Sequence, residues 1–321
     1  MTADSPPLQN PMESETLQCM EVWGGNQTAS RQVRLSGLEA WVWARPYGGS
    51  AGGDVHYVSS CGTGRIVRIL VADVSGHGEE VSETSAALRN LMRRHVNTLE
   101  QNRFVRSLNK EFRKLVDRGQ FATAIAATFF APTADIELTN AGHPRPLVRR
   151  ASEGIWRYIE GTPTPPKVVA NLPLGIIKES KYVSSQIHLD PGDMLMLYSD
   201  AVTEAQNPSG DMLDEEGLLQ LLARITSSKP SQILPELLKK LEAWRGAPSD
   251  DDETIMILVA DGGEPDSSFG ERLRAGGRLA GGILQAVKTG GPFPWPDLTP
   301  ANLGGAIIPS LSRRWAKRKK N

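Results

Sequence analysis

The order of the apolar segments constrains the fold of this chain more than any other feature of its sequence. Groups of strand-like segments are separated by two pairs of segments whose apolar residues recur at helical spacing. In chain order we predict strands at 38–45 and 65–72, helices at 79–97 and 104–116, strands at 121–130, 135–141 and 193–199, helices at 218–225 and 233–244, and a strand at 254–260. Because βαβ alternation does not dominate, the pattern favours layered sheets flanked by helix pairs over a parallel Rossmann-type sheet.

Three regions differ in composition along the chain. Residues 1–34 are rich in Pro, Ser and Glu, which predicts a flexible N-terminal segment. The regular pattern of strands and helices occupies residues 35–261. Residues 262–321 are rich in Gly, Pro, Arg and Lys and end in RRWAKRKKN, which is typical of a tail. We therefore expect one folded domain between two flanking segments.

The bulk composition excludes several classes of protein. Hydrophobic residues make up 39% of the chain and charged residues 23%, as in a soluble globular protein, and a net charge of -1 gives no basic field for nucleic acid. The two cysteines, Cys19 and Cys61, are not spaced as in a zinc ribbon, and their scarcity fits a reducing compartment. The N-terminus lacks the apolar core of a signal peptide, and no segment has the ~18 apolar residues of a membrane span. We therefore expect a cytoplasmic protein without a transmembrane segment.

Acidic residues stand where the apolar strands begin or end. Asp73 closes RILVA, Asp200 closes MLMLYS, and residues 250–252, all Asp, precede ETIMILVA. Asp54 lies in the Gly-rich turn GGSAGGD, ahead of another strand. If the last strand is antiparallel to the other two, these carboxylates meet at one edge of the sheet, where they would repel one another. Mg²⁺ or Mn²⁺, which prefer oxygen ligands, would resolve that conflict.

Asp is also common in turns, so any single one of these residues is more simply explained as an ordinary strand-end residue. The segments around them decide between the two explanations. In chain order they are GGD at 52–54, DVSGHG at 73–78, FATA at 121–124, NAGHPRPL at 140–147, LPLGI at 172–176, PGDMLMLYSDAVTEAQN at 191–207 and DDET at 251–254. Together these blocks resemble the SpoIIE-type (RsbU-like) branch of the metal-dependent PPM, or protein phosphatase 2C, superfamily over about residues 36–261.

The resemblance implies an α+β fold: a four-layer α-β-β-α sandwich of two mainly antiparallel sheets flanked by helix pairs, with two Mn²⁺ or Mg²⁺ ions between the sheet edges. Carried over residue by residue, Asp54 would bind the second metal, and Asp73 would bridge both ions, joined by the carbonyl of Val74. Asp200 and Asp251 would complete the first metal. Asp73 and Asp200 are thus the expected catalytic residues, and a water shared by the metals would attack phosphorus in line.

Two positions depart from the family pattern. Tyr57 stands where the family has a second acid after the GGD block, and Ala201 replaces the Gly of a Y-T-D-G block. Neither change removes an expected metal ligand, so we expect activity to be retained. His77 and His143 are interpreted as structural rather than catalytic, and Asp252 as a solvated neighbour of the site.

By the same resemblance, the expected activity is that of a metal-dependent protein-serine/threonine phosphatase. The expected substrate is a phosphorylated STAS-type anti-sigma factor antagonist, whose dephosphorylation would act in partner switching around a sigma factor. No nucleic-acid partner is expected, and control would come from a partner, from homodimerisation or from the flanking segments. The alternative is a catalytically weak or inactive module that keeps the fold and binds a phosphoprotein. Tyr57 and Ala201 favour this alternative, whereas four mutually repelling carboxylates argue against it.

Overall fold

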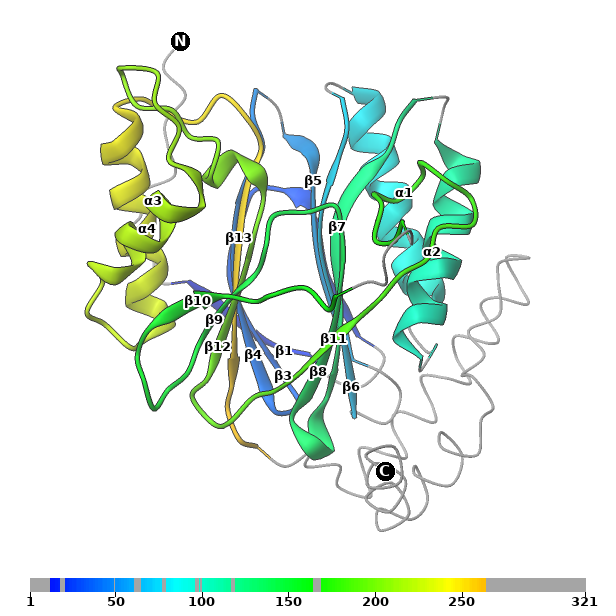
Figure 1. Ribbon diagram of the computed structural model, residues 1–321, viewed down its shortest axis with the longest axis horizontal. Coiled ribbons are helices and arrows are strands. Elements are labelled where there is room, and N and C mark those ends of the chain that lie inside the picture. The colour runs from blue at the N-terminus through cyan, green and yellow to red at the C-terminus, as the bar shows by residue number, and fades with distance from the viewer. Residues whose placement is uncertain are drawn as a thin grey trace.

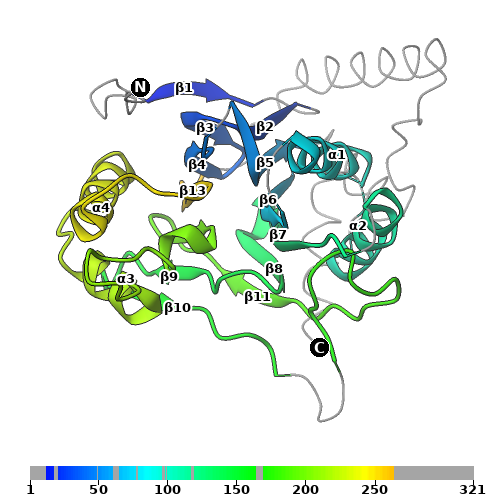
Figure 2. The same cartoon turned by 90° about the horizontal axis from the view of Figure 1, so that it is seen from above.

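The computed structural model describes residues 12–17, 21–48, 50–60, 65–76, 79–95, 98, 100–116, 119–163 and 169–263 of the 321-residue chain. Within these residues two β-sheets pack face to face, and a pair of helices covers the outer face of each (Figure 1). Seen from above, α1 (Glu79–His95) and α2 (Gln101–Leu115) lie on one side of the sheets, and α3 (Asp214–Ala223) and α4 (Pro230–Arg245) lie on the other (Figure 2). The predicted four-layer α-β-β-α sandwich is confirmed.

The larger sheet supplies half of the candidate site. Among the described residues it has seven strands in the order β1-β3-β4-β13-β12-β9-β10. Their bounds are β1 Glu13–Thr16, β3 Ala29–Leu35, β4 Leu38–Arg45, β13 Glu253–Ala260, β12 Met194–Tyr198, β9 Leu147–Arg149 and β10 Trp156–Tyr158. Neighbouring strands are antiparallel except β1 and β3, which are parallel. The pairing of β12 with β13 therefore places the end of one strand beside the start of the other.

The smaller sheet supplies the other half of the site. In the described part of the chain it has six antiparallel strands in the order β11-β8-β7-β6-β5-β2. Their bounds are β11 Ser185–His188, β8 Asp135–Ala141, β7 Ala122–Phe130, β6 Ile66–Val74, β5 Ala51–Ser60 and β2 Val22–Gln27. The predicted strand pair is β7 and β8, which the 3-10 turn η1 (Ala131–Thr133) connects.

β6 is apolar from Ile66 to Ala72 apart from the buried Arg68, and this composition reflects burial on both faces of the strand. Ile69 and Val71 lie in the core between the sheets, whereas Leu70 and Ala72 pack under α1 and α2. A strand between a second sheet and a helix layer has no solvent face, so polar and apolar residues do not alternate along it. Asp73 continues the inner-face register of Ile69 and Val71, which places it between the sheets at the end of the strand.

The helices are amphipathic, as their predicted stripes require. In α2, Phe104, Leu108 and Phe112 are fully buried against the smaller sheet. The stripe of α4 includes Leu237 and Leu241, which pack against the larger sheet. None of the helices in the described ranges combines the length and the apolar character that crossing a bilayer requires.

The predicted boundaries of the domain need one correction. The segment 1–34, predicted to be flexible, contains β2 and β3, and β3 pairs with β4 along its whole length. The domain therefore begins before residue 35. Surrounding polar residues masked the alternating apolar positions of β3, of which Val33 and Leu35 are buried. Of the predicted tail at 262–321, all but the first two residues lie outside the described part of the chain.

Candidate metal centre

The two sheets bring acidic side chains together at one end of the sandwich. In the smaller sheet, Asp54 of β5 lies directly opposite Asp73 of β6. Asp54 is 6% exposed, and Asp73 is partly buried. The prediction that Asp54 sits in a turn ahead of a strand is wrong, because β5 already begins at Ala51. Pairing within the sheet, rather than a turn, sets the position of this carboxylate.

The larger sheet contributes two more acids. Asp200 begins the 3-10 turn η2 (Asp200–Val202) after β12, and Asp251 lies just before β13. Because β12 and β13 are antiparallel neighbours, both residues lie at the same end of this sheet. The expectation that all the acids meet at the edge of one sheet is therefore corrected. They come from strand ends in two facing sheets.

The electrostatics of the four acids show that they influence one another. Burial, together with the carboxylates of Asp200 and Asp251, raises the pKa of Asp73 to about 7. Burial and Asp73 raise the pKa of Asp54 well above its usual range. The pKa values of Asp200 and Asp251 are raised too, by burial and by neighbouring carboxylates. Among the described residues, no Lys or Arg is one of the main influences on these four groups.

This donor set fits a divalent cation. Bound Mg²⁺ or Mn²⁺ takes oxygen ligands and stabilises the charged form of each carboxylate. Asp54 Oδ2 is buried without a hydrogen-bond partner in the described structure, which leaves it available to an ion. Within the described residues, however, no three His, Cys, Asp or Glu side chains are already arranged to hold one. That these residues bind metal therefore stays a prediction. The predicted ligands are Asp54, Asp73, Val74, Asp200 and Asp251.

Two glycines at the start of β5 allow close packing around the acids. A Cβ atom on Gly53 would lie 2.9 Å from the carbonyl oxygen of Val74 and 3.3 Å from Asp73 Oδ1. A Cβ atom on Gly52 would collide with the carboxylate of Asp252. The absence of side chains lets β5 approach the end of β6, so the Val74 carbonyl lies beside the acids.

Asp252 has a structural role that the sequence did not reveal. Its Oδ1 accepts a hydrogen bond from the backbone N–H of Tyr47 at 2.7 Å, and its Oδ2 accepts one from the backbone N–H of Gly53. The interpretation of Asp252 as a solvated neighbour is therefore wrong. Its carboxylate ties Tyr47 and Gly53 to the start of β13, and Gly53 directly precedes Asp54 in the chain. The partners are about two hundred positions away in sequence, so no local signal could have found this role.

Glu204 is a further acid at the site, which the sequence motifs did not single out. Its carboxylate contributes to the raised pKa values of Asp73 and Asp200. The turn after β12 sets its position, because its backbone N–H donates a hydrogen bond to the carbonyl of Asp200 at 2.8 Å. The YSDAVTEA block contains this residue, and its spacing from Asp200 is the signal that could have identified it.

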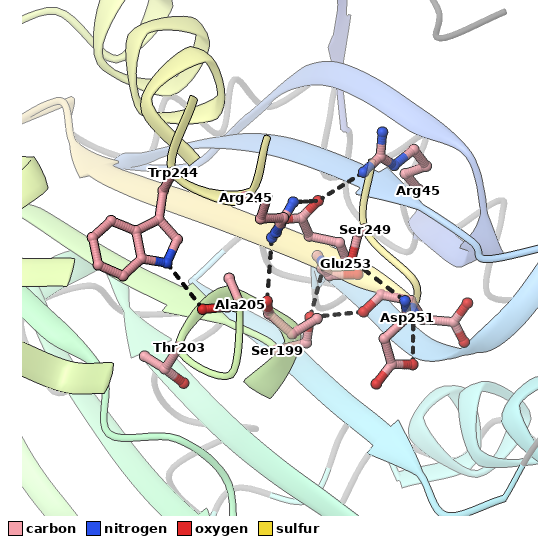
Figure 3. A network of polar contacts seen from close by, with 12 residues as sticks. Arg45, Ser199, Thr203, Ala205, Trp244, Arg245, Ser249, Asp251 and Glu253 are labelled. Atoms are coloured by element: carbon pink, nitrogen blue, oxygen red, sulfur yellow. Dashed lines mark hydrogen bonds and ion pairs between the residues drawn. The ribbon is translucent and has the colours of Figure 1, made fainter. Parts of the chain in front are cut away.

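Ser199 and Thr254 fasten the two strands that carry Asp200 and Asp251. The Ser199 N–H donates to the Thr254 carbonyl, and the Thr254 N–H donates to Ser199 Oγ, each at 2.9 Å. Both residues are fully buried, and their hydroxyls oppose the rise in the pKa of Asp54. Figure 3 shows Ser199 between η2 and the start of β13. These hydrogen bonds hold the start of the Asp200 turn beside the start of β13, which follows Asp251.

The two departures from the family pattern leave the acids in place. Tyr57 is fully buried among apolar residues under α1 and α2, and burial raises its pKa to about 12. Because side chains alternate along a strand, Tyr57 and Asp54 belong to opposite faces of β5. Ala201 is buried in η2 and is not among the described non-glycine residues with positive φ. Its backbone conformation therefore does not require Gly.

His143 makes contacts of the structural kind that the sequence predicted. It is buried, its Nδ1 lies 2.8 Å from Thr123 Oγ1, and its backbone N–H donates to Asn140 Oδ1 at 2.8 Å. Burial lowers the pKa of His143 to about 4, so its ring is neutral near pH 7. His77 lies outside the described residues.

The fold and these acids agree with what the sequence shares with known proteins. The sequence profile of the family described as Stage II sporulation protein E (SpoIIE) matches residues 63–261. Because this match covers more than half of the chain, the chain belongs to the SpoIIE family. The predicted resemblance is thereby confirmed.

Two similar proteins come from Bacillus subtilis. The chain is 23% identical over 193 residues to phosphoserine phosphatase RsbU, an alignment that covers 60% of this chain and 55% of RsbU. It is 23% identical over 196 residues to phosphoserine phosphatase RsbP, covering 60% of this chain and 45% of RsbP. The chain thus spans about half the length of these curated relatives.

Solved structures confirm the fold. The RsbU and RsbW domains of a Mycobacterium tuberculosis protein superpose with a TM-score of 0.59 at 22% identity, covering 77% of this chain and 68% of that chain. The PP2C phosphatase domain of SpoIIE from Bacillus subtilis, with a fragment of its regulatory domain, gives 0.57 at 17% identity, covering 69% and 63%. RsbX in complex with magnesium gives 0.51 at 18% identity, covering 71% and 98%.

Proposed function

We propose that this protein is a metal-dependent phosphatase that removes phosphate from Ser or Thr side chains of a protein. The observation that carries the proposal is the group of four aspartates from two facing sheets, whose pKa values are raised by burial and by neighbouring carboxylates. This group lies in a chain of the SpoIIE family. Asp251 is exposed, so a protein substrate can reach the centre from solvent.

Each aspartate has a proposed role in holding two ions. Asp73 would contact both ions; support comes from its pairing with Asp54 in its own sheet and from the effect of Asp200 and Asp251 of the other sheet on its pKa. Bound Mn²⁺ or Mg²⁺ would supply Lewis acidity at the phosphoryl oxygens and at water. The chain itself holds the carboxylates in register with the Val74 carbonyl through β5–β6 pairing and the Ser–Thr hydrogen bonds between β12 and β13.

The proposed substrate is a phosphorylated STAS-type anti-sigma factor antagonist, which places the protein in a partner-switching pathway. Support comes from its similarity to the phosphoserine phosphatases RsbU and RsbP. Homodimerisation is one proposed route by which such an activity is controlled.

The activity is tested with p-nitrophenyl phosphate and with a phosphoserine-bearing STAS protein. Metal-stripped protein is assayed with Mn²⁺, with Mg²⁺ and with EDTA, and phosphate release from the STAS protein is compared with release from a phosphotyrosine peptide. We expect hydrolysis with a divalent ion, none with EDTA, and preference for the phosphoserine protein.

Three other outcomes of this assay are informative. Hydrolysis that persists in EDTA would overturn the metal-dependent mechanism. Binding of the phosphoprotein without hydrolysis under any divalent ion would favour the inactive binding module. Hydrolysis of the aryl phosphate alone would reassign the protein as a small-molecule phosphohydrolase.

A further inference from the structure

The C-terminal end of α4 holds the turn that carries Asp200. Trp244 Nε1 donates a hydrogen bond to the Ala205 carbonyl at 3.1 Å, and Arg245 Nη2 donates one to the Ala201 carbonyl at 3.2 Å (Figure 3). The two acceptors bracket the segment that follows Asp200. Because both donors are consecutive residues of one helix, the turn is attached to α4 as a unit.

The same arginine contacts the strand that follows Asp251. Glu253, the first residue of β13, is 1% exposed, and Arg245 donates to both of its carboxylate oxygens, to Oε2 from Nη1 at 3.2 Å and to Oε1 from Nη2. Arg45 Nη2 also donates to Oε2, at 3.3 Å. Arg245 is itself buried. One guanidinium group therefore links the Asp200 turn to the segment that carries Asp251 (Figure 3).

This linkage depends on the shape of the guanidinium group. Its planar fork donates to both oxygens of a carboxylate and has a further N–H for a carbonyl, whereas an ammonium is a point charge on a flexible stem. Such a buried ion pair is weak evidence for stability, since apolar residues of similar volume often stabilise a fold as well. Directional hydrogen bonds to the turn η2 and to the first residue of β13 fix the relative position of these two segments. Residues that orient metal ligands without contacting the metal commonly tune metal affinity in this way.

We propose that Arg245, anchored by Glu253, is a positioning residue that fixes Asp200 and Asp251 relative to each other for binding a divalent cation. The inference rests on the proposed function, which assigns both aspartates to the metal centre. Arg45 and Arg245 are two cations around one buried carboxylate, so the charge of Glu253 is balanced within this group. Arg245 acts through the backbone and contacts neither ion nor substrate.

The test compares two Arg→Lys variants at opposite ends of β12. Arg245→Lys keeps the charge but loses the forked hydrogen bonding. Arg150→Lys is the matched control, because Arg150 Nη1 also joins a buried carboxylate, that of Asp193, to a carbonyl, that of His188, each at 2.7 Å. Folding of the metal-stripped full chain is checked by circular dichroism and by the unfolding temperature. The Mn²⁺ dissociation constant is then measured by titration calorimetry, and kcat and KM for p-nitrophenyl phosphate at saturating Mn²⁺.

We expect Arg245→Lys to weaken Mn²⁺ binding by about 10- to 100-fold and to lower kcat more than KM changes. Arg150→Lys should lower only the unfolding temperature. If folded Arg245→Lys binds Mn²⁺ as wild type does, or if both variants weaken binding equally, the inference is overturned. If Arg245→Lys does not fold, the double variant Arg245→Met/Glu253→Gln, which removes both buried charges, is judged by the same criterion. Failure of the wild type itself to bind Mn²⁺ would instead refute the proposed function.

Discussion

Two aspartates flank the short strand β12, and their surroundings are opposite. Asp193 precedes the strand and is 2% exposed. Its carboxylate accepts hydrogen bonds from Arg150 Nη1 at 2.7 Å and from the backbone N–H groups of Ala151 at 2.8 Å and Asp190 at 3.0 Å. Burial acts to raise the pKa of Asp193, but these hydrogen bonds together lower it below its usual value. This aspartate is fully satisfied by the protein.

Asp200, at the other end of β12, has no Arg or Lys of the described residues among the main influences on its carboxylate. Burial and the carboxylate of Glu204 raise its pKa, with only backbone N–H groups opposing them. It also acts on Asp73 and Asp251, whose pKa values are raised in turn. A protein tolerates such a cluster of buried acids, at a cost in stability, where a bound group such as a cation balances the charge. The contrast teaches that partners, rather than position at a strand end, separate a structural carboxylate from a functional one.

The largest expected difference between the acid cluster and the paired Asp193 is in catalysis. Asp73→Asn removes the carboxylate proposed to contact both ions, so we expect kcat/KM for p-nitrophenyl phosphate to fall by about 10²–10³-fold or more. Asp193→Asn should keep near wild-type activity at a temperature where it remains folded. Full activity of Asp73→Asn would rule out the two-ion mechanism for this protein.

Asp200→Asn and Asp251→Asn sharpen the comparison within the acid cluster. Each variant removes one proposed ligand of the first ion. Loss of a residue that only hydrogen-bonds to a metal ligand costs about 10- to 100-fold in metal affinity or activity, so we expect activity at low Mn²⁺ to fall by at least that factor. Because weaker binding is offset by mass action, high Mn²⁺ should restore part of the activity. The measurement is activity as a function of Mn²⁺ concentration. An unchanged Mn²⁺ dependence would remove the altered residue from the ligand set.

Asp252→Asn separates a structural acid from its neighbour Asp251. The amide can accept one of the hydrogen bonds from Tyr47 and Gly53 but presents N–H to the other donor. We therefore expect a loss of about 1–2 kcal/mol in the free energy of unfolding, measured with urea, and a smaller loss of activity than in Asp251→Asn. If Asp252→Asn were as inactive as Asp251→Asn, the register of the final motif would be misassigned.

At the paired end of β12 we expect an effect on stability alone. Asp193→Asn should reduce the free energy of unfolding by about 1–3 kcal/mol at pH 7, because it removes the charge that Arg150 contacts. The folded-state pKa of Asp193 lies below the unfolded value of about 3.9, so its contribution is present above that value and is lost as pH falls through the folded-state pKa. The difference between wild type and variant should therefore shrink below about pH 4 in urea unfolding. A difference independent of pH would show that packing, not charge, is responsible.

The long elements could be predicted from sequence because burial leaves a strong signal. β6, β12 and β13 are buried on both faces and consist mainly of apolar residues, and α2 shows a clear stripe. The short strands β9, β10 and β11 have three or four residues each, too few for a period to emerge. β3 was missed because its polar residues outnumber its apolar ones, and pairing with β4 decides its structure.

The site was predictable where position along the chain carries the information. Asp73, Asp200 and Asp251 stand at strand ends, so the alternation of apolar runs and acids identified them. The roles of Asp252 and Arg245 depend on contacts between distant segments and have no local pattern. Which sheet each acid belongs to was equally hidden, because strand order is set by tertiary pairing.

The central claim is that the unpaired acid cluster binds a divalent cation, and the Mn²⁺ dependence of the unfolding temperature tests it most directly. At Mn²⁺ a hundred times its dissociation constant, binding adds about 2.7 kcal/mol, a rise of roughly 5–10 °C for a domain of this size. We predict that rise for metal-stripped wild type and for Asp193→Asn, and none for Asp73→Asn. Without metal, Asp73→Asn should be more stable than wild type near pH 7, because the substitution relieves repulsion among the carboxylates. An equal rise in Asp73→Asn, or none in wild type, would contradict the claim.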